Sequence, residues 1–288
     1  MSQRIYTVKP ATRALTPTGG FLSGFAYSLN PYVGCAFGDA GGCPFCYVRM
    51  LPVAQAGPVD QVGRAPWGSW VIAKSNLAEK LEAEVAALEK RGRLEQTTIF
   101  MSSATDPYQG LERRLRLSRA ALEVLARYPI RRVLVQTRSP LVERDLDLLC
   151  RLGTRVIVSI TIETDDDTVR RAITPTSPSV ARRFRTARTL RAAGIFVQLA
   201  IAPMMPNDAE RFSSMAADAA DRVVVDTYFA GDGAGGTRSR ALGIGTLYAK
   251  LGYQRWFQSD AHRDLLTAMR RRLGPSRVLF SRAGFNAV

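Results

Sequence analysis

Residues 30–50 read NPYVGCAFGDAGGCPFCYVRM and contain three of the four cysteines of the chain, Cys35, Cys43 and Cys46. Their spacing is C-x7-C-x2-C, and Gly and Pro residues shape the loop that carries them. Three thiolates this close together can bind three irons of a cubane cluster and leave the fourth iron open to an outside ligand. The loop therefore predicts a cluster that takes part in chemistry, rather than one that only carries electrons.

A zinc site is the first alternative for this loop. A structural zinc site uses four ligands, typically in two close pairs. Among Cys and His residues, only Cys150 and His262 are left to complete the set, and each lies more than 100 residues from Cys46. Clustered thiols without a disulfide framework also suit a reducing compartment, where they bind metals or catalyse reactions. We predict an iron–sulfur cluster and keep zinc as the alternative.

Length and hydropathy limit the class of protein. The chain has 288 residues, of which 46% are hydrophobic, enough for one large domain or two modest ones. No apolar run approaches the roughly 18 residues that span a bilayer. Arg4, Lys9 and Arg13 near the N-terminus are not followed by an apolar stretch, so no signal peptide is expected. These features predict a cytoplasmic protein without a membrane partner.

The charge is strongly basic. The formal net charge is +15, and only five of the 40 basic residues are Lys. Arg suits phosphate because of its planar fork of donors, so the charge is compatible with a polyanionic partner. An Arg-rich composition with solvated helix faces explains the same numbers. Charge alone therefore leaves contact with nucleic acid open.

Short apolar runs rich in β-branched residues alternate with amphipathic stretches. Each run is bounded by Gly, Pro, Ser or Asp, as strands of a buried parallel sheet are. The expected strands are residues 25–33, 97–101, 132–137, 155–162, 195–201 and 222–228. The expected helices are residues 76–90, 111–127, 141–152, 179–193 and 208–220. About six strand–helix units predict an α/β fold, either a partial barrel or an open doubly wound sheet, with its chemistry at the carboxyl ends of the strands.

The chain divides into three predicted segments. Residues 1–25 form an irregular N-terminal arm, residues 26–230 the α/β part, and residues 231–288 a helical C-terminal extension. The extension begins with a glycine-rich loop from Gly231 to Gly236 and ends with a short strand near residues 277–281. The loop is expected either to hold a substrate phosphate together with Arg238, or to act as a flexible lid.

The cysteine loop, with an aromatic residue (Tyr47) directly after it, resembles the cluster loop of radical S-adenosylmethionine (SAM) enzymes. The common spacing in that superfamily is C-x3-C-x2-C, so this chain has four extra residues between Cys35 and Cys43. Further strings resemble the spore photoproduct lyase-like branch of the superfamily. They are SATDPYQ (103–109), TRSPLVERDLDLL (137–149), SITIETDDDTVRRAITPTSP (159–178) and LRAAGIFVQLAIAPMMP (190–206).

This resemblance implies a partial (β/α)6 TIM-type barrel with two cofactors, a [4Fe–4S] cluster and SAM. The cluster ligands would be Cys35, Cys43 and Cys46. In such enzymes SAM chelates the open iron, and reductive cleavage gives a 5′-deoxyadenosyl radical that abstracts hydrogen from the substrate. The residues that the resemblance places at SAM are Tyr47 and Ala202 at the adenine, Asp106 at the methionyl amine, and Arg138 and Ser159 at further SAM contacts.

The resemblance also implies a substrate class. We expect a lyase-like enzyme for repair or modification of nucleic acid, DNA rather than RNA, reduced by a partner such as flavodoxin or ferredoxin. The photoproduct lyases return hydrogen to the product from a cysteine in the loop after the second strand, and here that loop reads Ser103-Ala104-Thr105. Cys150 is expected to be a buried small residue, so the catalytic hydrogen donor stays unknown. The alternatives are radical chemistry on a small molecule or peptide, and a non-catalytic, zinc-stabilised nucleic-acid-binding protein.

Overall fold

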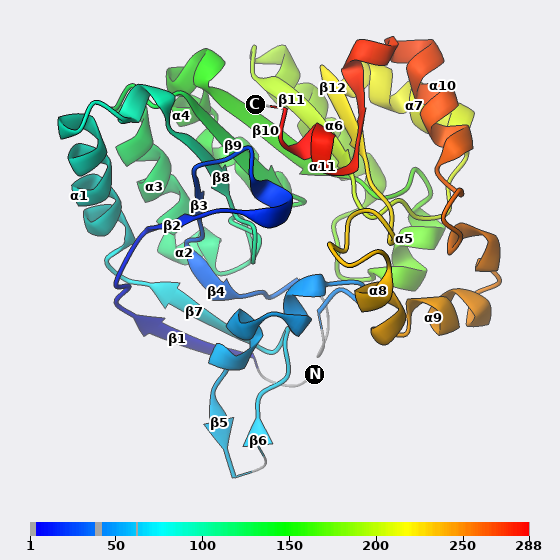
Figure 1. The fold of residues 1–288 in the computed structure, drawn as a ribbon, viewed down its shortest axis with the longest axis horizontal. Coiled ribbons are helices and arrows are strands. Elements are labelled where there is room, and N and C mark those ends of the chain that lie inside the picture. Colours follow the sequence, from blue (N-terminus) through cyan, green and yellow to red (C-terminus); the bar gives the residue numbers. More distant parts are fainter. Residues whose placement is uncertain (1–3, 38–41, 62, 288) are drawn as a thin grey trace.

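A computed structural model describes residues 4–37, 42–61 and 63–287. Its centre is an eight-stranded sheet in the order β13-β12-β11-β10-β9-β8-β3-β2, in which every pair is parallel except β2 with β3 (Figure 1). Its strands are β2 (Leu15–Pro17), β3 (Tyr27–Leu29), β8 (Thr98–Met101), β9 (Arg132–Thr137), β10 (Val156–Thr161), β11 (Phe196–Ile201), β12 (Arg222–Val225) and β13 (Val278–Phe280).

Helices cover the outer face of this sheet. Those that pack on it are α1 (Leu77–Lys90), α3 (Leu117–Ala126), α4 (Leu146–Leu152), α6 (Val180–Ala192), α7 (Ala209–Ala219) and α10 (Arg263–Leu273). The other helices are α2 (Glu112–Leu115), α5 (Asp167–Ile173), α8 (Thr237–Ala241), α9 (Ile244–Lys250) and α11 (Ser281–Phe285). The main core lies between sheet and helices, because alternate strand residues such as Val133, Val158 and Leu199 pack against helix residues such as Leu122 and Phe184.

The inner face of the sheet is filled by different side chains. Phe25 packs there with Phe100 and Ile157, and Phe285 of α11 packs with Val224. Helix α11 therefore lies on the inner side of the sheet, opposite the covering helices, as Figure 1 shows. The arrangement confirms the predicted partial barrel, and it leaves the carboxyl ends of the strands as the place for a site.

A second, three-stranded sheet flanks the barrel in the order β1-β7-β4. It consists of β1 (Ile5–Lys9), β7 (Trp70–Lys74) and β4 (Tyr32–Gly34). A hairpin of β5 (Val59–Asp60) and β6 (Gly63–Arg64) projects from the body beside it (Figure 1). Short 3-10 helices connect these elements: η1 (Gly20–Leu22), η2 (Tyr47–Met50), η3 (Pro52–Ala56), η4 (Leu94–Gln96), η5 (Pro140–Asp145), η6 (Gly153–Arg155), η7 (Gln254–Trp256) and η8 (Pro275–Arg277).

The first expected strand and the N-terminal arm differ from the prediction. The expected strand at residues 25–33 is two strands, because the chain turns at Asn30 and Pro31 and continues as β4 in the other sheet. The arm is not irregular, since it contains β1 and β2. Both β2 and β13 join the main sheet, and the segment boundaries near residues 25 and 230 stay predictions.

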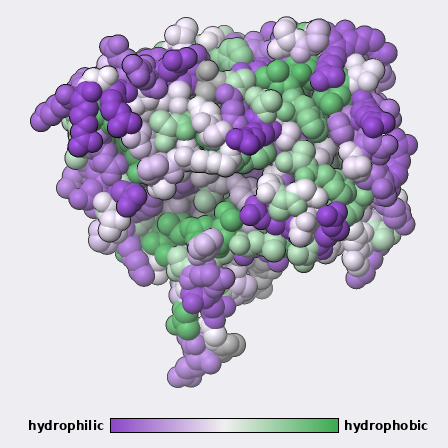
Figure 2. All heavy atoms as spheres, in the orientation of Figure 1, coloured by the Kyte–Doolittle hydropathy of each residue, from purple (hydrophilic) through white to green (hydrophobic). Residues whose placement is uncertain are grey.

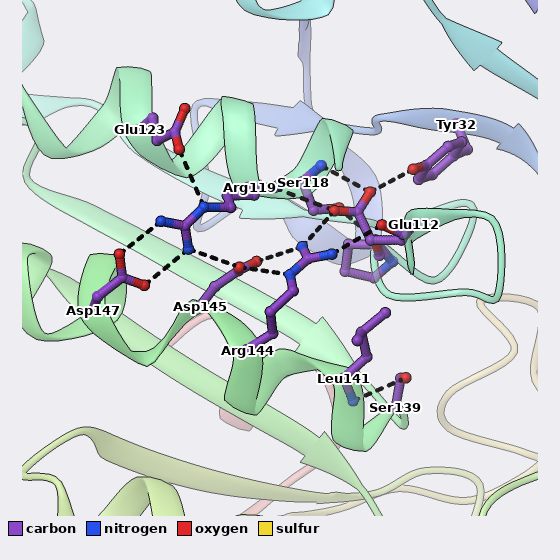
Figure 3. A network of polar contacts seen from close by, with 11 residues as sticks. Tyr32, Glu112, Ser118, Arg119, Glu123, Ser139, Leu141, Arg144, Asp145 and Asp147 are labelled. Carbon is purple, nitrogen blue, oxygen red and sulfur yellow. Dashed lines mark hydrogen bonds and ion pairs between the residues drawn. The ribbon is translucent and has the colours of Figure 1, made fainter. Parts of the chain in front are cut away.

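The expected helix at residues 111–127 is broken into α2 and α3. Arg116 has φ +55°, in the left-handed region that interrupts a helix. Glu112 explains the break, since its carboxylate accepts a hydrogen bond from the amide of Ser118 at 3.0 Å, in the first turn of α3 (Figure 3). In the described part of the chain, no helix is long and apolar enough to cross a bilayer.

Candidate active site

The three cysteines lie at the carboxyl end of the barrel, beside the chain that leaves β4. Cys35 directly follows β4, and Gln109 Oε1 accepts a hydrogen bond from the next amide, that of Ala36, at 2.8 Å. Cys43 and Cys46 share a tight turn in which the amide of Cys46 donates to the carbonyl of Cys43 at 3.0 Å. All three side chains are partly exposed. Most of the extra loop, residues 38–41, lies outside the described residues.

The electrostatics of these thiols fit a shared group. Burial and the neighbouring Cys43 and Cys46 together raise the pKa of Cys35 to about 12. Burial and the neighbouring Cys43 likewise raise the pKa of Cys46 to about 11. Cys43 raises the pKa of both Cys35 and Cys46, so the three sulfurs lie close together, and they need positive charge to become thiolates. A [4Fe–4S] cluster supplies that charge, so the donor set fits the predicted cofactor.

A closed zinc site is not formed by the other two candidate ligands. The expectation that Cys150 is buried is wrong, because Cys150 is exposed on α4, with Sγ 3.8 Å from the carbonyl of Ala193. The His262 ring stacks on Phe280 with the centroids 4.6 Å apart. Among residues 4–37, 42–61 and 63–287, no group of three or more His, Cys, Asp or Glu side chains is placed to hold a metal ion. Cubane ligands each bind a different iron, so they need not converge on one point as zinc ligands do.

Arg138 joins the cysteine loop to the barrel. It follows β9, and its Nη1 donates to Cys43 Sγ at 3.0 Å and to Ser177 Oγ at 3.3 Å. Burial raises the pKa of Cys43, and the positive charge of Arg138 partly offsets that rise. Burial lowers the pKa of Arg138, but Cys43 and Glu163 outweigh it, so that pKa lies above its usual value and the side chain stays a cation.

Behind Arg138 lies a fully buried ion pair. Glu163 follows β10, and its Oε1 lies 3.2 Å from Arg138 Nη2. Its Oε2 accepts a hydrogen bond from Arg183 Nη1 of α6 at 2.5 Å. Burial alone raises the pKa of Glu163, but Arg138 and Arg183 outweigh that, so its pKa lies below the usual value. Glu163 is thus a carboxylate that two guanidinium groups share.

Asp106 lies in the loop after β8 and is also buried. Its Oδ1 accepts hydrogen bonds from the Thr137 hydroxyl at 2.7 Å and from the amide of Tyr108 at 2.9 Å. Its Oδ2 accepts from the amide of Arg138 at 2.9 Å. Burial raises the pKa of Asp106, although these hydrogen bonds oppose the rise. Asp106 therefore fixes the chain around Arg138, and Oδ2 keeps a second lone pair for another donor.

The other predicted SAM contacts occupy different depths. Tyr47 is at the surface, and its hydroxyl donates to the carbonyl of Ser103 at 2.8 Å. Ala202 follows β11 and packs against the inner-face cluster that contains Phe285. Ser159 is fully buried inside β10, where its hydroxyl accepts from Gln198 at 2.9 Å. The structure therefore brings Arg138 and Asp106 to the cysteines but places Ser159 deeper, and its contact with SAM stays a prediction.

An aromatic cluster and the glycine-rich loop form another part of the site. Tyr228, after β12, lies with its ring 6.3 Å from Phe45 of the cysteine loop, and its hydroxyl is 2.6 Å from that of Tyr248. In the glycine-rich loop, the amides of Ala234, Gly236 and Ser239 donate to the Asp232 carboxylate. These amides are already occupied, so of the two expected roles the phosphate cradle is the less supported.

Sequence reasoning missed Glu163 and Arg183. Arg183 belonged to a basic run that we interpreted as a solvated helix face, yet it is fully buried. Its position held a signal, because Val180, Ala187 and Leu190 lie three, four and seven residues from it, on one helical stripe. An Arg within such a stripe requires a buried acidic partner. Glu163, directly after a continuous apolar strand, was the available acid.

Comparisons with known proteins agree with this geometry. The radical SAM superfamily matches residues 29–218. An uncharacterized protein of Methanocaldococcus jannaschii is 29% identical over 208 residues, which are 72% of this chain and 71% of that protein. An uncharacterized protein of Acidianus two-tailed virus is 30% identical over 205 residues, 69% of this chain and 63% of that protein. The chain thus spans less than two thirds of the viral relative.

The solved structures give the same fold. Spore photoproduct lyase complexed with dinucleoside spore photoproduct superposes with a TM-score of 0.65 at 14% identity, covering 96% of this chain and 81% of that chain. At this identity the likeness concerns the fold. The family match confirms the predicted superfamily and cofactors. The chain belongs to the radical SAM superfamily and is an enzyme that uses a [4Fe–4S] cluster and SAM to generate a 5′-deoxyadenosyl radical.

Proposed function

We propose that this radical SAM enzyme repairs or modifies nucleic acid, DNA rather than RNA, in a lyase-like reaction. The observation that carries the proposal is a set of Arg side chains around the carboxyl end of the barrel that have no acidic partner among the described residues. They are Arg49 of η2, Arg113, Arg114 and Arg116 at α2, and Arg238 and Arg240 of α8.

Their placement favours phosphate contacts over a random excess of charge. Arg113 and Arg114 are exposed on α2, directly after the loop that carries Asp106. Helix α8 contacts η2, so Arg238 and Arg49 approach the cysteine loop from the other side. Many Arg residues elsewhere are in ion pairs, for example Arg188 with Asp218. Guanidinium groups without an acidic partner attract a phosphate backbone.

Arg138 is the proposed ligand for the SAM carboxylate. Its Nη1 is committed to Cys43 and Ser177, and its Nη2 lies 3.2 Å from Glu163 Oε1, which leaves the Nε proton and the second Nη2 proton without a partner among the described residues. These two nitrogens form the side-on edge that binds a carboxylate with two parallel hydrogen bonds. Asp106 Oδ2 is the proposed acceptor for the methionyl amine. Cys35, Cys43 and Cys46 would hold the cluster, which would supply the electron for cleavage.

The fold likeness supports the substrate class only as an analogy. The similar spore photoproduct lyase structure holds a dinucleoside photoproduct. The loop after β8 here has Ser103, Ala104 and Thr105 and no cysteine, so a different group must return hydrogen to any product radical. An acidic flavodoxin or ferredoxin is the proposed reductant, since its charge complements this basic chain.

Anaerobic reconstitution tests the proposal in two stages. First, the protein is expected to bind about four irons and four sulfides per chain and to cleave SAM with dithionite, whereas Cys43→Ala loses both properties. Second, irradiated DNA is added, and deuterium is followed between 5′-deoxyadenosine and the DNA product. Cleavage of SAM without transfer to DNA or RNA would contradict the substrate class and favour a small molecule or peptide.

Duplex binding gives an independent test of the Arg side chains proposed to contact phosphate. Replacing Arg113 and Arg114 with Ser is expected to weaken DNA binding and lower the salt slope by about two. Replacing Arg188 and Arg191 with Ser is the matched control, because both are partly exposed Arg residues that already pair with Asp218 and Asp221. Equal losses of DNA affinity in both variants would show that total charge, and not the position of Arg113 and Arg114, attracts DNA.

A further inference from the structure

We propose that Glu163 is a positioning residue that holds Arg138 at the cluster and SAM site, with Arg183 as its buried counter-charge. The inference rests on the proposed role of Arg138 in binding SAM and adds the reason why that side chain points where it does. Glu163 touches no sulfur itself, so it acts through Arg138.

The contacts fix Arg138 from two sides. Nη2 lies 3.2 Å from Glu163 Oε1, and Nη1 lies 3.3 Å from Ser177 Oγ. The Ser177 carbonyl in turn accepts from Arg170 Nη1 at 3.0 Å, which anchors that loop. Between these supports, Nη1 reaches Cys43 Sγ at 3.0 Å. An Arg side chain has several rotatable bonds, so a buried anion and a hydroxyl on either side limit it to one orientation.

The charges show why Glu163 also depends on Arg183. Arg183 and Glu163 are both fully buried, and Arg183 Nε and Nη2 have no hydrogen-bond partner among the described residues. Among the described residues, Glu163 is the only acid in an ion pair with Arg183. Removing Glu163 therefore leaves the buried charge of Arg183 uncompensated, and removing Arg183 leaves Glu163 with Arg138 as its one ion-pair partner among the described residues. A free Glu163 would be costly to ionise, and only the ionised form attracts Arg138.

The same three residues leave one positive charge unbalanced. Arg138 and Arg183 carry two positive charges against the single negative charge of Glu163. The trio thus suits one further anion next to Cys43, such as the carboxylate of SAM. Without Glu163, two guanidinium groups would face each other and Arg138 would move away. Glu163 is therefore needed to keep the cation in place, although it carries the same sign as the ligand.

A neighbouring pair offers a matched control. Arg182 precedes Arg183 on α6 and pairs with Glu143 of η5 at 3.0 Å, but 38% of the Arg182 side chain is exposed. Glu143 and Glu163 are thus two glutamates that bind adjacent arginines of the same helix. Only Glu163 also contacts Arg138. An exposed pair of this kind contributes little to stability and has no route to the cysteines.

The test measures the Kd of SAM for the reconstituted holoenzyme by anaerobic calorimetry, alongside iron content and the thermal midpoint. Glu163→Gln is expected to raise the Kd at least about tenfold with unchanged iron content, while Glu143→Gln leaves it unchanged. The decisive measurement is a double-mutant cycle. In an Arg138→Ala background, Glu163→Gln is expected to add no further loss, because the residue that it positions is gone.

The outcomes separate this inference from the proposed function. Wild-type holoenzyme that does not bind SAM would overturn both. Wild-type Kd in Glu163→Gln, or losses that add in the double variant, would overturn the positioning role alone, and a lower thermal midpoint with normal Kd would leave Glu163 with a merely structural role. If Glu163→Gln does not fold, Glu163→Asp keeps the charge and shortens the reach. It is expected to raise the Kd about threefold, only when Arg138 is present.

Discussion

Two buried charge networks in this protein look alike and differ in what they leave unsatisfied. One lies at the corner between α2, α3 and η5, where Glu112 and Asp145 bind Arg119 and Arg144 (Figure 3). The other joins Glu163 to Arg138 and Arg183 beside the cysteines. In the first, every charged group has partners. In the second, Arg183 Nε and Nη2 and Glu163 Oε1 lack a hydrogen bond among the described residues.

The difference separates a network that fixes a fold from one that serves a site. The Glu112 carboxylate accepts from Arg144, from the Tyr32 hydroxyl and from the amide of Ser118, so it closes the chain on itself. Arg138 instead directs a donor at a sulfur atom. Buried networks in which every group has a hydrogen-bond partner make a structure rigid, whereas donors without an acceptor mark a place for a ligand. Figure 2 shows apolar residues gathered beside β4, above the projecting hairpin of β5 and β6.

The largest expected effect breaks the corner network. Glu112→Ala leaves Tyr32 and part of Arg144 without their buried acceptor and is expected to lower the free energy of unfolding by about 3–5 kcal/mol. Urea denaturation measures the loss. Glu89→Ala, an exposed glutamate of α1, is the control with little change. Holoenzyme that remains folded should keep the wild-type Kd for SAM, and a large rise would show that the two networks are coupled.

A buried carboxylate that forms no ion pair with a described residue sharpens the comparison. Asp226 follows β12, is 3% exposed and accepts from the amide of Thr227 at 2.8 Å. Burial raises the pKa of Asp226 to about 7. Burial also acts on Glu163, but the two Arg partners of Glu163 hold its pKa below the usual value. The backbone of Gly231 closes over it, since a Cβ there would lie 2.3 Å from Asp226 Oδ2.

The sign of the pH dependence follows from that pKa. The folded-state pKa lies above the unfolded value of about 3.9, so the folded protein holds this proton more tightly. The resulting stability is fully present below that unfolded value and is lost as the pH rises through about 7. Between about pH 5.5 and pH 8.5 the wild type is expected to lose about 2 kcal/mol relative to Asp226→Asn. Equal pH profiles in urea denaturation would place a cation near Asp226.

A smaller effect separates charge from geometry at Arg138. Arg138→Lys keeps the cation but replaces the side-on fork with a single ammonium group. We expect the Kd of SAM to rise about tenfold, less than in Arg138→Ala, because one of two parallel hydrogen bonds is lost. Arg182→Lys is the control. Unchanged affinity in Arg138→Lys would assign the effect to charge alone.

The sequence predicted most of the sheet because its strands are continuous local runs. Residues 132–137 were expected as a strand and form β9 at the same positions. The strand at residues 25–33 could not be divided from sequence, since the split depends on β4 pairing with β7, far along the chain. Arg116 ends α2 where the Glu112 carboxylate accepts from the Ser118 amide, and Tyr32 and Arg144, distant in sequence, hold that carboxylate, which no local pattern shows.

In the site, too, local features could be predicted and long-range contacts could not. The cysteines and Arg138 were predicted because they lie in short motifs or directly after strands. The contact of Glu163 with both Arg138 and Arg183 was not predicted, because it depends on β9, β10 and α6 meeting in space. The glycine-rich loop was interpreted from its glycines, yet Asp232 organises it by accepting from two of its amides, those of Ala234 and Gly236, and from the Ser239 amide of α8. An Asp between glycines typically folds a loop around its own carboxylate.

The smallest expected effect lies within the corner network itself. Arg119 binds the fully buried Asp145 at 3.1 Å and Asp147 at 2.7 Å, but 55% of the Asp147 side chain is exposed. The hydrogen bond from Arg119 lowers the pKa of Asp147 to about 2, so its stabilisation is present above the unfolded value and is lost as the pH falls through about 2.

Solvent screens that pair, so Asp147→Asn is expected to cost less than about 1 kcal/mol, and less still at high salt. Asp145→Asn removes the buried partner of the same guanidinium and is expected to cost several times more. Urea denaturation of both variants at low and high salt measures the contrast. Similar costs would mean that burial does not set the strength of these ion pairs, and the distinction between the buried Arg119–Asp145 pair and the exposed Arg119–Asp147 pair would then fail.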